Sequence, residues 1–122
     1  MSSVHELLEL AKENYDFESV DGIFQAETCL SGFIGEGGPR LFLVVAAEAA
    51  GIIDAFATFA DTEHTSHEEA LTRVGFNNSF GVQLLGPAFA LRTYFDAEAT
   101  TQESFIREIE LLNSTAKNLI VR

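Results

Sequence analysis

Apolar side chains recur at helical spacing in three stretches of this chain, and a residue that can cap a helix precedes each stretch. In each stretch the apolar residues fall on one face and the charged residues fall on the other. A serine or threonine also stands three residues before a glutamate, which is the pattern of a capping box. The predicted helices cover residues 4–14, 66–74 and 102–120, with Ser3, Ser66 and Thr100 as caps and Thr101 as an alternative to Thr100.

Alternating apolar and polar residues predict strands in the remaining segments. The stretch from Leu41 to Val45 is apolar at every position, which is typical of a central strand that is covered on both faces. The alanine-rich residues 46–50 can extend that strand or form a turn of helix, and Gly51 allows the chain to reverse after them. The five predicted strands are residues 24–30, 40–47, 52–60, 81–85 and 88–95.

The order of these elements, α-β-β-β-α-β-β-α, predicts an α+β fold in which helices pack on a five-stranded antiparallel sheet. No linker or internal repeat divides the sequence, so we predict a single domain over residues 1–122. Three helices cover only part of such a sheet, and a homodimer would bury the apolar area that remains.

The formal net charge of −12 narrows the classes of partner. Such a field repels phosphate backbones and anionic lipid surfaces, so we expect no nucleic-acid partner and no membrane partner. It favours a protein partner with basic patches, although acidity also serves solubility alone. The start of the chain lacks the pattern of a signal peptide and Cys29 is the single cysteine, so we expect a reducing, cytoplasmic setting.

The best candidates for metal chemistry surround the start of the second predicted helix. His64 and His67 stand close to Asp61, Glu63 and Glu68, and these are residue types that bind zinc and related ions. A polar loop that enters a helix explains the same residues, because acids are favoured near a helix N-terminus. We therefore assign no metal ligand.

Motifs for catalysis and cofactor binding are absent from the sequence. The glycines of residues 35–38 are not followed by the lysine of a phosphate-binding loop, and no G-x-S-x-G elbow occurs. Glu48 and Asp54 flank a turn, where solvated strand-end charges are commoner than an acid–base pair. We expect no catalytic residue and no cofactor; a small-molecule or metal-binding regulatory domain and a small hydrolase are the alternatives.

The C-terminal half carries a likeness to a known fold. A loop with Asn77 and Asn78 precedes a glycine-containing strand at residues 80–84, and a second strand at 90–95 leads into residues 100–105 and the final helix. With the order of elements and the segment 21–24, nearly the whole chain resembles the class I type III secretion chaperones (Tir chaperone-like, CesT) and the related YbjN family. The resemblance implies a non-enzymatic homodimer that shields an extended or apolar segment of a secreted or regulatory protein.

The resemblance also implies where such a protein engages its partners. The face of the first helix and the first strand would contact the partner segment, through Leu7, Leu8 and Phe24. Apart from the resemblance, we expect the dimer interface around the second helix and the fourth strand, because four apolar side chains cluster there. These are Leu71, Val74, Phe76 and Phe80. For both sets the alternative is that the side chains belong to the core.

Overall fold

The computed structural model describes residues 2–21, 25–75 and 80–120. In this part of the chain three α-helices pack on one antiparallel sheet of six strands, so the α+β class is confirmed. The helices are α1 (Val4–Asn14), α2 (His67–Val74) and α3 (Gln102–Leu119). The strands are β1 (Glu18–Ser19), β2 (Thr28–Gly32), β3 (Leu41–Val45), β4 (Ile52–Asp61), β5 (Gly81–Leu85) and β6 (Ala88–Asp96). Two short 3₁₀ turns, η1 (Glu48–Ala50) and η2 (Ala97–Ala99), follow β3 and β6.

Side-chain caps set the starts of the helices. Ser3 and Glu6 form the reciprocal capping box that the sequence predicts, and Ser66 accepts a hydrogen bond from the backbone of Glu69. The third helix is capped by Thr101, the alternative residue. Thr100 is already committed to η2, where its hydroxyl donates to the Asp96 carbonyl at 2.6 Å.

The strand order is β1-β2-β3-β4-β6-β5, and every neighbouring pair is antiparallel. All five residues of β3 are buried, as expected for a central strand. The predicted number of five strands is wrong, because β1 adds a sixth. β1 has two exposed residues, Glu18 and Ser19, and therefore carries no alternation that a pattern could detect. The predicted strand at residues 24–30 is β2, and residues 22–24 lie outside the described part.

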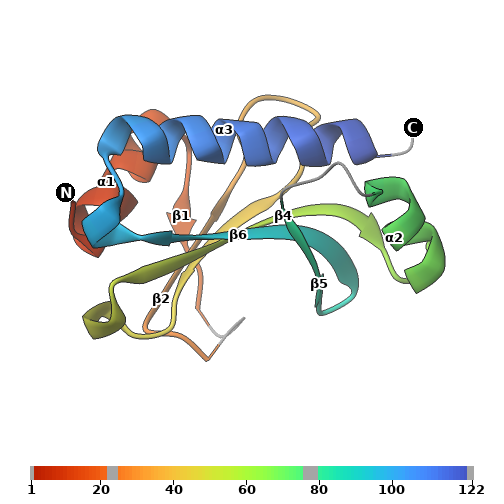
Figure 1. Ribbon diagram of the computed structural model, residues 1–122, viewed down its shortest axis with the longest axis horizontal. Coiled ribbons are helices and arrows are strands. Elements are labelled where there is room, and N and C mark those ends of the chain that lie inside the picture. Colours follow the sequence, from red (N-terminus) through yellow and green to blue (C-terminus); the bar gives the residue numbers. More distant parts are fainter. Residues whose placement is uncertain (1, 22–24, 76–79, 121–122) are drawn as a thin grey trace.

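The helices α1 and α3 cover one face of the sheet, and α2 lies at one end of it (Figure 1). α3 packs across β4 and β6, and its stripe of Phe105, Ile109 and Leu112 is fully buried. This stripe meets the helix-facing side chains of the sheet, of which Leu43, Ile53, Ala55 and Leu91 are fully buried. At roughly 1.5–3 kcal/mol for each large buried side chain, this interface is the main hydrophobic contribution to stability.

The opposite face of the sheet has its own smaller apolar cluster. Cys29, Phe42, Val44, Phe56 and Ala90 form it, and the side chains packed against it come from segments flanking the strands and from Leu85. The register explains the cluster, because Phe42 pairs with Phe56 and Cys29 pairs with Val44 across adjacent strands. We call this side the helix-free face, since no described helix covers it (Figure 1).

Two glycines make the tight turns between strands. Gly51 ends η1 with φ of 71°, so residues 48–50 form a helical turn and do not extend β3. Gly86 has φ of 58° and, with Pro87, closes a two-residue hairpin between β5 and β6. Pro87 cannot adopt positive φ, so this glycine-first turn matches the type II′ geometry that suits the twist of a hairpin.

Candidate protein-binding surface

The two edges of the sheet differ in length and in charge. β1 closes one edge with two residues, and β5 forms the other edge with five. β5 pairs with β6 on one side, and within the described residues no strand pairs with its other side. Charged residues, prolines and bulges commonly protect such edges from pairing with another chain. β5 contains no charged residue and no proline. β5 is therefore a template on which another strand can form backbone hydrogen bonds.

Two large leucines, one on this strand and one on α2, are exposed. Leu84 of β5 is 48% exposed and Leu71 of α2 is 60% exposed, although both are large apolar side chains. The two elements are linked through Phe89, which pairs with Leu84 across the sheet and contacts the His67 ring at 5.1 Å. We call β5 together with Leu71 the β5–α2 edge.

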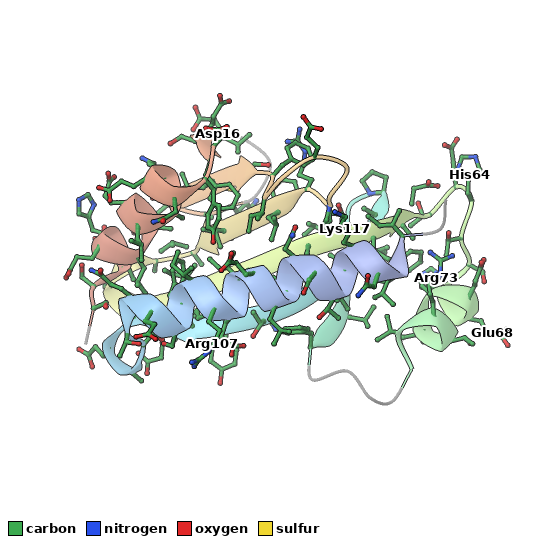
Figure 2. The ribbon with its side chains drawn as sticks, turned by 90° about the horizontal axis from the view of Figure 1, so that it is seen from above. Asp16, His64, Glu68, Arg73, Arg107 and Lys117 are labelled. Atoms are coloured by element: carbon green, nitrogen blue, oxygen red, sulfur yellow. The ribbon has the colours of Figure 1, made fainter. Side chains whose placement is uncertain are left out.

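Arg73 holds α2 in place against the C-terminal end of α3. Its guanidinium donates to the Leu119 carbonyl at 3.2 Å and to the Glu69 carboxylate at 3.1 Å. Figure 2 shows Arg73 between these two helices, while Glu68 points away from them. The bridge fixes the orientation in which α2 presents Leu71 beside the sheet.

The residues expected at the dimer interface occupy different environments. Leu71 is exposed, Val74 is half-buried against the core, and Phe80 is buried in the core at 9% exposure. Phe76 lies outside the described residues. The structure thus places Leu71 on the surface, and it also exposes Leu84 on β5, a residue that sequence reasoning missed. Residues 81–85 carry no charge, but the sequence does not show that this strand lies at the edge of the sheet.

The residues expected to contact a partner segment are less accessible. Leu7 is fully buried and Leu8 is 8% exposed, so both belong to the core in this structure. Leu8 also lines a cavity of about 210 Å³ between α1 and the sheet, where His5 and Glu48 contribute polar groups. Phe24 lies outside the described residues.

The candidate metal ligands separate into two groups. Asp61, Glu63 and His64 bring their ligand atoms within 4.8 Å of one another, and all three are exposed. Asp61 accepts from both the backbone N–H and the ring of His64 at 2.8 Å, and these bonds lower the pKa of Asp61. His67 instead contacts the Phe89 ring. The Asp61–His64 pair closes the loop that leads to α2, and His64 points into solvent (Figure 2).

The two acids considered for catalysis lie in different local environments. Asp54 pairs with Arg92 at 2.6 Å on the helix-free face, and the pair is partly exposed. Glu48 begins η1, where its backbone N–H donates to the Glu27 carboxylate at 2.8 Å. Each acid thus has its own ionic or hydrogen-bonding environment.

Comparison of the sequence with known proteins does not identify a function for this surface. No family model matches the sequence, and the curated proteins contain no match either. Within the described residues, no helix is both long enough and apolar enough to cross a membrane. The function must therefore be argued from the chemistry of the surface itself.

Proposed function

We propose that this chain is a non-enzymatic protein-binding module that pairs with a second copy through the β5–α2 edge. As a homodimer it would shield an extended or apolar segment of a partner protein, in the manner of the chaperones that the sequence resembles. The observation that carries the proposal is the uncharged, five-residue strand β5 at the edge of the sheet, which exposes Leu84, together with exposed Leu71 on α2.

Charge favours this edge over the rest of the surface. The chain has 19 acidic residues against seven basic ones, so two copies repel one another at most approaches. β5 contributes no charge to such a contact. Two antiparallel β5 strands related by a two-fold axis would join the sheets of both copies, with each leucine present twice.

The two leucines supply a measurable part of the dimer's stability. Full burial of a leucine is worth about 1.5–3 kcal/mol, and Leu71 and Leu84 have 60% and 48% of their surface left to bury. Counting both copies, they contribute about 3–6 kcal/mol, which corresponds to roughly two to four powers of ten in the dissociation constant.

Light scattering coupled to size exclusion over a range of concentrations tests the dimer. We expect a wild-type dimer and a monomeric Leu84→Lys variant. Leu111→Lys is the matched control, because Leu111 is a 46% exposed leucine on α3 and carries the same change of charge. A monomeric wild type, or equal dimerisation of the two variants, contradicts the proposal. Circular dichroism checks that both variants are folded.

The chaperone-like activity has a separate test. The wild-type dimer should slow the aggregation of an unfolded model protein at stoichiometric amounts and without nucleotide, because shielding involves no turnover. Leu84→Lys should lose this effect if the dimer is the active form, whereas Leu111→Lys should keep it. Absence of any effect from the wild-type dimer would leave a dimer without the proposed activity.

We further infer a reducing, cytoplasmic setting for this module. The support is the chemistry of Cys29, whose thiol is buried on the helix-free face and whose pKa is raised by that burial. A buried neutral thiol with no second cysteine in the chain gains nothing from an oxidising compartment.

A further inference from the structure

A cavity of about 440 Å³ opens on the helix-free face, beside the turn that follows β5. Its size falls within the range of pockets that hold small molecules, about 300–1,000 Å³. Phe42, Thr58 and Leu85 line it together with the hairpin residues 86–88, and among the described residues Arg40 is the one charged residue in the lining. An apolar wall with a single cation is the composition of a site for an amphipathic anion.

The local structure holds the cavity open. Arg40 stands immediately before β3, and its carbonyl accepts from the backbone N–H of Thr58 at 3.1 Å. On the other side Gly86 turns the β5–β6 hairpin, and the pairing of Leu85 with Ala88 fixes the two strands that end there. Both walls therefore belong to regular, hydrogen-bonded strands, so the cavity is largely preformed.

The guanidinium of Arg40 is positioned but not neutralised. Its Nη1 donates to the Ser31 hydroxyl at 3.0 Å, and its Cζ lies 5.2 Å from the centre of the Phe33 ring and 6.0 Å from that of Phe42. Within the described residues no carboxylate lies within ion-pair distance of Arg40. A guanidinium has five N–H donors, so most of its capacity is left for a planar anion.

Neighbouring charges decide what kind of anion fits. Asp16 and Glu18 line an adjacent cavity of about 260 Å³ that also contacts Arg40, and the whole chain carries a net charge of −12. A bare anion such as phosphate would meet this negative field with little to offset it. A ligand with an apolar body gains additional free energy by burying that body against Phe42 and Leu85.

We propose that this cavity binds a small amphipathic carboxylate, such as a medium-chain fatty acid. The carboxylate pairs with Arg40 through two N–H donors, and the aliphatic chain lies along the apolar wall formed by Phe42, Leu85 and the β5–β6 hairpin. The lining shares Leu85 with the dimer contact proposed above, and the Leu85 side chain packs on the helix-free face.

Titration of octanoate into the ¹⁵N-labelled protein, followed by amide chemical shifts, tests this site. We expect shifts centred on residues 40–42 and 85–88, with neutral 1-octanol binding about tenfold more weakly because it lacks the charge-assisted bonds. Arg40→Gln should weaken octanoate binding by about tenfold or more for the same reason. Ala88→Leu, which keeps the charge and fills the cavity, should also abolish the shifts.

Arg107→Gln is the matched control, because it makes the same change of charge on an exposed arginine of α3. This variant should bind octanoate as the wild type does. The proposal would be overturned by no octanoate shifts in the wild type, by shifts centred elsewhere, by equal affinity for octanoate and octanol, or by equal effects of Arg40→Gln and Arg107→Gln. Inorganic phosphate serves as an anionic probe that has no apolar body. Phosphate binding as tight as that of octanoate would also overturn the proposal.

Discussion

Replacing Asn113 by leucine should stabilise this protein. Asn113 lies on the buried side of α3 and is 8% exposed, yet its Oδ1 atom has no hydrogen-bond partner among the described residues. The oxygen faces Gly38 in the turn between β2 and β3, where a Cβ on Gly38 would come within 3.4 Å of it. Leucine has the same fork at Cγ and needs no donor, so Asn113→Leu removes an uncompensated polar group.

The gain can be worked from these contacts. A buried polar group without a partner costs about 1–3 kcal/mol, and leucine adds a few tenths of a kcal/mol of helix propensity. Part of this gain is offset by fitting two methyl groups against Gly38, so we expect a net gain of about 1–2 kcal/mol. For a chain of 122 residues, the entropy of unfolding is such that each kcal/mol of added stability raises Tm by about 4 °C. The expected gain therefore predicts a rise in Tm of about 4–8 °C.

Chemical denaturation and thermal melting followed by circular dichroism measure this change. Asn118→Leu is the matched control, because Asn118 is exposed on the same helix and reports propensity alone. Its Tm should change by about 2 °C or less. A lower Tm for Asn113→Leu than for the wild type would refute the reasoning, since it would show that the Asn113 carbonyl contributes net stability in the folded protein.

Three further predictions concern single residues. Gly32→Ala should destabilise the fold by about 2–3 kcal/mol in denaturant titrations, because the new Cβ would overlap the buried Phe17 ring; an unchanged midpoint would contradict this. An NMR titration should find the pKa of Asp61 below its usual value, and His64→Ala should restore it only in part, because the backbone N–H remains. Since the folded pKa is lowered, the associated stabilisation is present above the unfolded pKa and is lost as pH falls through the folded value. A normal pKa for Asp61 would rule out the hydrogen bonds. Finally, Cys29 should react with a thiol reagent only in denaturant, because its thiol is buried and its pKa is raised; rapid labelling of the native protein would contradict the burial.

Most of the helices and strands can be predicted from the pattern of apolar and polar residues, because these local signals agree with the tertiary packing. The stripe on α3, the all-apolar β3 and the cap at Ser3 each predict elements that the structure confirms. The misses have local causes. β1 is too short to alternate, and the cap of α3 moves to Thr101 because η2 uses Thr100. Strand order is set by packing between distant segments, and no local pattern contains that information.

The candidate surface could be predicted only in part. Leu71 is apolar on a short amphipathic helix, so its exposure depends on how α2 docks, and Arg73 determines that docking through Leu119. The exposure of Leu84 depends on β5 being the last strand of the sheet. The cavity beside Arg40 arises where β3 and the β5–β6 hairpin approach one another, and its lining residues Phe42 and Leu85 are 43 positions apart in the sequence.

The position of α3 in the chain has a consequence for how the protein folds. α3 covers β4 and β6, and it follows every strand along the chain (Figure 1). During synthesis the apolar side of the sheet therefore stays open until residues 102–119 have left the ribosome, and the nascent chain is then most prone to aggregate. The backbone N–H of Ser2 also bonds to the Ala97 carbonyl, so α1 gains this anchor only after all the strands have been made. Folding of this domain should therefore wait for α3, with the slow kinetics typical of contacts between distant segments.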